Sequence, residues 1–177
     1  MMCLTLLRGI RALTMLFLLL ALRANAQQPW LPTEFIVPER YVFAEFLLTK
    51  VDPALAENDH QALLQARQQI RRDLASEWPE DGLTVAANRE SLENDLQSFS
   101  KRQAFTYHLL ELKTGRIVGC VYLSPSNTAQ YQAVIYYWLL PSYYQSANHS
   151  QIRQQIYDWI KREWPFNSVD VSLNAAL

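Results

Sequence analysis

Three histidines and one of the two cysteines are the side chains in this sequence whose chemistry best suits catalysis or metal binding. His60, His108 and His149 are far apart along the chain, so no two of them have the spacing of a metal-binding pair. Cys120 lies inside a run of β-forming residues, where a small buried thiol is the ordinary state. A nucleophilic cysteine needs an activating histidine or a positive environment, and His108 on the neighbouring predicted strand is the only candidate. The sequence therefore predicts no metal site and identifies no catalytic residue.

Glu111 stands just before a predicted turn and has two interpretations. A carboxylate there could serve as a general base if it faced a cleft. Lys113 and the turn follow directly, which favours a solvent-exposed residue instead. His149, at the predicted start of the last helix, is likewise interpreted as a surface histidine.

Aromatic side chains gather in and just after a later predicted strand: Tyr136, Tyr137, Trp138, Tyr143 and Tyr144. They could form a wall against which a ligand or peptide binds near the end of the strand. Aromatic residues also favour strands for reasons of packing alone. We favour packing, and keep the ligand wall as the alternative.

The first 26 residues differ in character from the rest. Arg8 and Arg11 form a basic start, residues 13–22 are apolar apart from Thr14, and residues 24–26 (Ala-Asn-Ala) give a small-x-small cleavage pattern. This order is that of a secretory signal peptide. The apolar run has about half of the ~20 residues that a membrane-spanning helix needs. We therefore predict a signal peptide over 1–26 and an exported domain, periplasmic or secreted; an uncleaved anchor is the alternative.

The charge balance changes when this leader is set aside. The leader holds three of the 16 basic residues and none of the 17 acidic ones, so the remaining chain has 13 against 17 and a net charge of −4. A mildly acidic domain gives no electrostatic reason to expect nucleic acid as a partner, or a membrane beyond the leader itself. The partner is then an unidentified small molecule or protein.

The remaining pattern predicts an extended lead-in over 27–40 and a single domain over 41–177. Strands are predicted over 41–51, 105–112, 116–123, 131–140 and 169–173, and helices over 58–78, 90–102 and 150–163. Asn58 or Asp59 is the predicted cap of the first helix. The order is β-α-α-β-β-β-α-β. The hairpin at 105–123 is antiparallel, and the final β-α-β favours a parallel pair with a right-handed crossover. The fold class is therefore α/β (α+β), a mixed, mostly antiparallel sheet with helices packed on it.

This order of elements resembles the core of the GNAT (N-acetyltransferase) superfamily. Three local signatures look like those of an uncharacterised bacterial branch: Trp78-Pro79 with Leu83-Thr84, Gly119-Cys120-Val121-Tyr122-Leu123 with Pro125, and Trp159-Ile160 with Trp164-Pro165-Phe166. The resemblance implies acetyl-coenzyme A as donor and an amine as acceptor. It also implies later elements after the fifth strand, which often carry the general acid and which this chain does not reach.

The donor loop is where the sequence departs from that resemblance. The family's loop reads Gln/Arg-x-x-Gly-x-Gly/Ala, whose glycines let backbone amides converge on the pyrophosphate. Residues 141–150 contain no glycine and no arginine. A hydrogen bond to a charged group contributes roughly 1.5–3 kcal/mol, so losing two of them costs roughly 3–6 kcal/mol, or roughly 10²–10⁴ in affinity.

The donor could still bind if the loop adapts. Asn148 could adopt a left-handed conformation in place of a glycine. In that case the resemblance implies that the backbone of Leu139 and Leu140 holds the pantetheine arm, and that Asn148 and Ser150 hold the phosphates.

Three hypotheses for the function follow. The preferred one is an exported GNAT-like binding or accessory module without efficient acetyl transfer and without a cofactor. The alternative is an N-acetyltransferase that uses acetyl-CoA through an atypical donor loop. A second alternative is a small-molecule pocket lined by Tyr136 and Trp138 and unrelated to coenzyme A.

Overall fold

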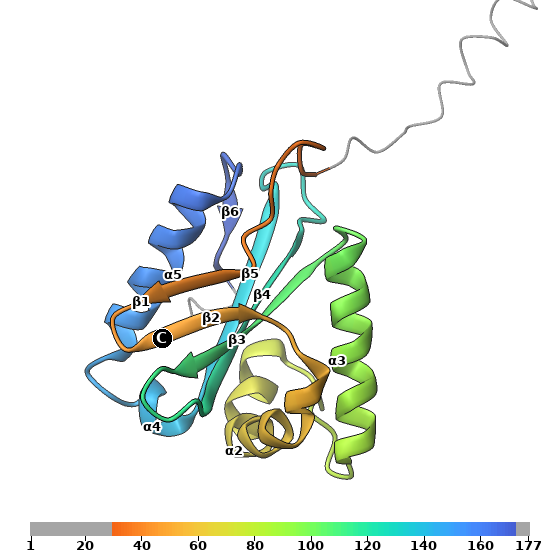
Figure 1. Cartoon of the computed structure of the whole chain (residues 1–177), viewed down its shortest axis with the longest axis vertical. Coiled ribbons are helices and arrows are strands. Elements are labelled where there is room, and N and C mark those ends of the chain that lie inside the picture. Colours follow the sequence, from red (N-terminus) through yellow and green to blue (C-terminus); the bar gives the residue numbers. More distant parts are fainter. Residues whose placement is uncertain (1–29, 173–177) are drawn as a thin grey trace, which may run out of the picture.

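One six-stranded sheet organises residues 30–172, the part of the chain that the computed structural model describes (Figure 1). Its strands, in chain order and in sheet order, are β1 (Arg40–Phe43), β2 (Phe46–Lys50), β3 (Phe105–Glu111), β4 (Ile117–Pro125), β5 (Ala133–Leu139) and β6 (Val169–Asp170). All neighbours are antiparallel except β5 and β6, which run parallel. The mixed, mostly antiparallel sheet and its parallel last pair are confirmed.

Helices cover both faces of this sheet (Figure 1). They are α2 (Ala56–Leu74), α3 (Val85–Ser100), the single turn α4 (Pro141–Tyr144) and α5 (His149–Glu163), with a short 3₁₀ turn η1 (Pro53–Leu55) before α2. Successive side chains of a strand point to opposite faces. On β3, Tyr107 meets Trp159 of α5 with ring centroids 5.1 Å apart, and the next residue, His108, lies against Asp59 of α2.

The first predicted strand, 41–51, is wrong in one respect: it is two strands joined by a tight turn. Phe43 and Phe46 face each other across the turn, where Ala44 has a positive φ of 45°. The alternation of apolar residues therefore changes phase, so that Phe43 is buried while Val42 is exposed. Alanine is not a turn residue by type, which is why the pattern gave no sign of the reversal.

Two helix starts differ from the prediction by two residues or more, and the first helix also ends four residues early, at Leu74. The first helix begins at Ala56, because Asp52 caps the preceding 3₁₀ turn by accepting from the amide of Ala54, and so Asp59 is a buried helical residue and not a cap. The second helix begins at Val85, five residues early, since Thr84 Oγ1 accepts from the amide of Ala87 at 3.1 Å. Both caps are local hydrogen bonds of the kind that fixes a helix start.

Two predictions reach beyond residues 30–172: the end of the last strand and the leader. β6 has two residues, and the predicted strand 169–173 runs past residue 172. No helix within residues 30–172 combines the length and apolar character needed to cross a bilayer. The predicted leader, 1–26, lies outside the described residues.

Candidate functional site

The predicted donor loop begins with one tight helical turn, α4, directly after β5. The amides of Tyr143 and Tyr144 both donate to the carbonyl of Leu140, at 2.9 and 3.0 Å. The next two amides, of Gln145 and Ser146, donate to carbonyls within the same turn, at 3.0 and 3.2 Å. These amide hydrogens point back into the turn and not toward a common external point, so four consecutive donors are unavailable to a phosphate.

The two leucines predicted to hold a pantetheine arm are buried at the end of β5. Leu139 lies opposite Gly119 of β4, and the amide of Leu140 donates to the carbonyl of Val118 at 2.8 Å. The carbonyl of Leu140 accepts from α4 as described above. Both polar backbone groups of Leu140 are therefore already used within the protein.

The two residues predicted to hold the phosphates lie at the start of α5. Asn148 is exposed and right-handed, with φ −76° and ψ −14°, so the left-handed conformation that could have replaced a glycine is not adopted. Ser150 is exposed in the first turn. Within residues 30–172, the amides of Ala147, Asn148, Ser150 and Gln151 have no hydrogen-bond acceptor. The helix start thus keeps free donors, although the α4 turn does not.

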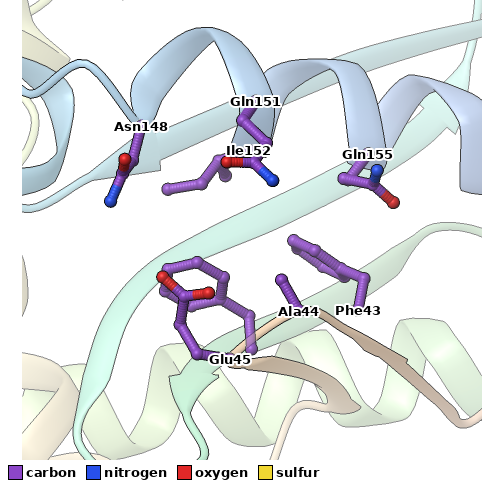
Figure 2. A pocket seen from close by; sticks show the side chains of 8 residues that line it. Phe43, Ala44, Glu45, Asn148, Gln151, Ile152 and Gln155 are labelled. Atoms are coloured by element: carbon purple, nitrogen blue, oxygen red, sulfur yellow. The ribbon is translucent and has the colours of Figure 1, made fainter.

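The hollow beside this helix start is very small. Figure 2 shows α5 side chains facing the β1–β2 turn across a narrow gap. Its volume is about 10 Å³, and its walls are Phe43, Ala44, Glu45, Phe46, Asn148, Gln151, Ile152 and Gln155. Such a space holds about one water molecule, whereas pockets for cofactors measure roughly 300–1,000 Å³. This hollow is therefore too small for acetyl-CoA in the conformation of the structure.

A larger, open hollow lies between α2 and the β3–β4 hairpin, with Leu140 in its wall. Its volume is about 250 Å³. It is lined by Asn58, Gln61, Ala62, Gln65, Thr114, Gly115, Arg116, Ile117 and Leu140. Three side-chain amides, one hydroxyl and one guanidinium make this lining polar and give it a positive charge. It can offer many hydrogen bonds to a small polar ligand.

Glu111 is held at the edge of this region by two hydrogen bonds. Thr114 Oγ1 donates to it at 2.6 Å and the hydroxyl of Tyr143 at 2.9 Å. These two donors lower the pKa of Glu111, and the nearby Arg116 adds to the effect. A general base at neutral pH needs a raised carboxyl pKa, so the geometry favours the solvent-exposed interpretation.

His149 contacts two tyrosines at the start of α5. Its Nε2 lies 2.9 Å from the hydroxyl of Tyr137, and its ring stacks on Tyr144 with centroids 4.6 Å apart. Partial burial lowers the pKa of His149, and the charge of Arg153 lowers it further. The imidazole is therefore a half-buried neutral group that anchors the helix start, and not the surface histidine that was predicted.

Tyr136, Tyr137 and Trp138 are buried in the sheet. Trp138 Nε1 donates to the hydroxyl of Tyr122 at 3.2 Å. None of the three lines either hollow described above. The packing interpretation is confirmed for these three residues.

A buried polar cluster lies under α2, on the opposite face of the sheet from α5. His108 and Cys120 are paired directly across β3 and β4, and Asp59 reaches them from α2. Asp59 Oδ1 lies 3.4 Å from His108 Nε2 and 3.5 Å from Cys120 Sγ. Asn88 of α3 donates to Asp59 Oδ2 at 2.9 Å. The proximity of His108 to Cys120 was expected, but Asp59 and Asn88 were not identified from the sequence.

The protonation of this cluster argues against a nucleophilic thiol. Burial would raise the pKa of Asp59, but the close approach of His108 and the hydrogen bonds from Asn88 and Cys120 together hold it below its ordinary value. Burial and the adjacent Asp59 carboxylate raise the pKa of Cys120 well above its ordinary value. A reactive cysteine needs a lowered pKa and access to solvent, and Cys120 has neither.

Comparison with known proteins identifies the fold. No family model and no curated protein matches the sequence. Solved structures do match. A putative ribosomal-protein-serine acetyltransferase from Vibrio cholerae has a TM-score of 0.55 at 16% identity, covering 72% of this chain and 70% of its own.

Two further structures agree with it. The microcin C7 self-immunity acetyltransferase MccE, in complex with acetyl-CoA and AMP, has a TM-score of 0.54 at 17% identity over 70% of this chain and 67% of its own. A GNAT-family acetyltransferase from Bacillus anthracis has a TM-score of 0.50 at 12% identity over the same shares. At these identities the likeness concerns the fold alone. The chain has the fold of the GNAT acetyltransferases.

Proposed function

We propose that this chain is an exported GNAT-fold binding module that does not carry out efficient transfer from acetyl-CoA. The observation that carries the proposal is the α4 turn, where four successive amides are bonded inside the turn. A donor site of the GNAT kind requires such amides to point together at a diphosphate. With no glycine in 141–150, the chain cannot easily reach the backbone conformations that would turn them outward.

The cost of reopening the turn supports the same conclusion. Each net hydrogen bond contributes roughly 0.5–1.5 kcal/mol, so freeing four amides costs roughly 2–6 kcal/mol before any contact to the cofactor forms. That cost lowers affinity by roughly 30-fold to 10⁴-fold. The hollow at the start of α5 would also have to enlarge from about 10 Å³.

The open hollow under the β3–β4 hairpin is the ligand site that this proposal implies. Arg116 supplies its positive charge, and Asn58, Gln61 and Gln65 supply amide donors and acceptors. This chemistry suits a small polar ligand that carries a carboxylate, because a guanidinium pairs with a carboxylate through two parallel hydrogen bonds. Replacing Arg116 with Gln would then weaken binding while leaving the fold intact.

Export belongs to the proposal and is tested separately. The leader predicted over 1–26 would direct a reporter enzyme that is active only outside the cytosol. Reporter activity with the native leader, and none with Leu18 and Leu19 replaced by Arg, would support export. A cytosolic reporter with the native leader would refute this part.

A thermal-shift titration with acetyl-CoA tests the central claim. Stabilisation follows RT ln(1 + [L]/Kd), which is about 2.7 kcal/mol at a hundredfold excess over Kd. We expect no shift at micromolar acetyl-CoA. A clear shift at that concentration would contradict the proposal.

The second candidate function is an N-acetyltransferase with an atypical donor site. It is favoured by the free amides of Ala147, Asn148, Ser150 and Gln151 at the start of a fifteen-residue helix. Ser150→Glu distinguishes it, since a carboxylate in the first turn stabilises the helix by roughly 0.3–1 kcal/mol but repels a diphosphate. A shift with acetyl-CoA that survives in Ser150→Gln and disappears in Ser150→Glu would show that the cofactor binds at this helix start, as this second function requires.

A further inference from the structure

Asp59, His108 and Cys120 form a constellation of three metal-ligand types on three different elements. Their donor atoms all lie within 4.8 Å of one another, and all three side chains are almost completely buried. Asp59 comes from α2, and the other two come from paired positions of β3 and β4. Helix and sheet thus bring together residues that the chain separates by 49 and 61 positions.

Two of the three separations between the donor atoms match those around a tetrahedral zinc ion. Zinc binds nitrogen and oxygen at about 2.0–2.2 Å and sulfur at about 2.3 Å, which places N and O ligands about 3.4 Å apart and S and O ligands about 3.5 Å apart. The observed distances are 3.4 Å from His108 Nε2 to Asp59 Oδ1 and 3.5 Å from Cys120 Sγ to the same oxygen. The His108 and Cys120 donor atoms lie within 4.8 Å of each other.

His108 provides an independent indication of a ligand. Its side chain is fully buried, yet neither ring nitrogen has a hydrogen-bond partner among the described residues. The 3.4 Å approach of Nε2 to Asp59 is an ion-pair distance, but it lacks the alignment of a hydrogen bond. A buried polar atom without a partner costs roughly 1–3 kcal/mol. A metal bond from Nε2 would satisfy the atom that faces Asp59 and Cys120.

Charge balance also favours a divalent cation. Asp59 as carboxylate and Cys120 as thiolate carry two negative charges, and His108 binds a metal as the neutral imidazole. With a doubly charged ion the site has no net charge, which avoids the large cost of burying an unpaired charge. Asn88 holds the second oxygen of Asp59 at 2.9 Å, as outer partners commonly orient metal-binding carboxylates.

From these observations we propose that Asp59, His108 and Cys120 bind one divalent transition-metal ion of the zinc type. Three protein ligands leave the fourth position to a small ligand such as water. This inference goes beyond the proposed function and does not depend on it. It departs from the sequence-based prediction of no metal, which considered only spacing along the chain.

Cobalt is the probe that tests the site. Full-length protein carrying Cys3→Ser and no histidine tag is freed of metal with a chelator and titrated with Co²⁺. Cys120 is then the only cysteine, so a thiolate-to-cobalt charge-transfer band can arise from no other residue. We expect one Co²⁺ per chain, this band, the visible bands of a four-coordinate ion, and loss of both when Zn²⁺ is added.

Three variants refine the result. His108→Gln and His149→Gln each remove one imidazole, but only the first should lower the affinity for Co²⁺, by more than about a hundredfold. Asn88→Leu should lower it by roughly 10–100-fold, as expected of a residue that orients a ligand. If His108→Gln does not fold, the titration of the parent protein still decides. Absence of the charge-transfer band at saturating Co²⁺, or equal melting temperatures with Zn²⁺ and with chelator, would overturn the proposal and leave a buried Asp59–His108 ion pair.

Discussion

The hydroxyl of Tyr137, near the end of β5, lies 2.9 Å from Nε2 of His149, the first residue of α5. This contact joins the end of β5 to the start of α5, and α4 lies in the chain segment between them. The segment 140–149, which would have to rearrange to bind a diphosphate, is therefore held by hydrogen bonds at Leu140 and at His149.

The first prediction concerns the pH dependence of stability through His149. Because its pKa is lowered in the folded protein, the unfolded chain takes up a proton more readily than the folded one below about pH 6.5. The contribution of His149 to the free energy of unfolding is then present above that pH and declines as the pH falls through it. Urea unfolding should show that the free energy of unfolding falls less between pH 7.5 and pH 5.5 in His149→Gln than in the parent protein. Identical losses in both proteins would contradict the assignment.

The second prediction concerns the close approach of β4 and β5 at Gly119. A Cβ added there would overlap the carbonyl oxygen of Trp138 and lie 2.9 Å from Leu139 Cδ2. Since backbone cannot yield as a flexible side chain does, Gly119→Ala should destabilise the protein by roughly 1–3 kcal/mol. Gly82→Ala is the matched control, because nothing lies within 4 Å of its added Cβ. Thermal unfolding of both variants would show the difference, and equal melting temperatures would refute the overlap.

The third prediction concerns Arg71, which fastens the loop after α2. Its guanidinium donates to the carbonyls of Glu77 at 3.1 Å and Pro79 at 2.6 Å, and to Asp81 Oδ1 at 3.0 Å. Lysine keeps the charge but lacks the planar fork that reaches three acceptors at once. Arg71→Lys should therefore cost roughly 1–3 kcal/mol and speed proteolysis of the 75–82 loop. The exposed Arg72 is the control, and an Arg72→Lys variant that loses as much would show that the fork does not matter.

The sequence was sufficient for most of the sheet and most of the helices, because β-rich runs and helical periodicity mark the buried elements. The β-rich runs 105–112 and 116–123 and the apolar face of the last helix correspond closely to β3, β4 and α5. The hairpin at Ala44 was missed for a physical reason. An alanine at positive φ is held there by the packing of Phe43 against Phe46, and no local residue type indicates that.

The site was harder to predict than the fold. The absence of glycine in 141–150 is visible in the sequence. The helical turn that binds the amides of this segment is not, because it depends on the position of the Leu140 carbonyl, which accepts two of them. Asp59 was interpreted as a helix cap, since its type suits that role. Only the register of β3 with β4 and the position of α2 over them place its carboxylate beside His108 and Cys120.

The fourth prediction concerns the two alanines held in left-handed backbone. Ala44 has φ 45° in the β1–β2 turn, and Ala75 has φ 47° just after α2. This conformation costs an L-residue roughly 1–2 kcal/mol, whereas glycine adopts it freely but loses roughly 0.5–1 kcal/mol more in chain entropy. Ala44→Gly and Ala75→Gly should each stabilise the protein by up to about 1 kcal/mol, while Ala86→Gly within α3 should destabilise it by about 1 kcal/mol. Chemical denaturation of the three variants checks the signs, and a loss of stability in Ala75→Gly as large as that in Ala86→Gly would show that the backbone at residue 75 carries no such strain.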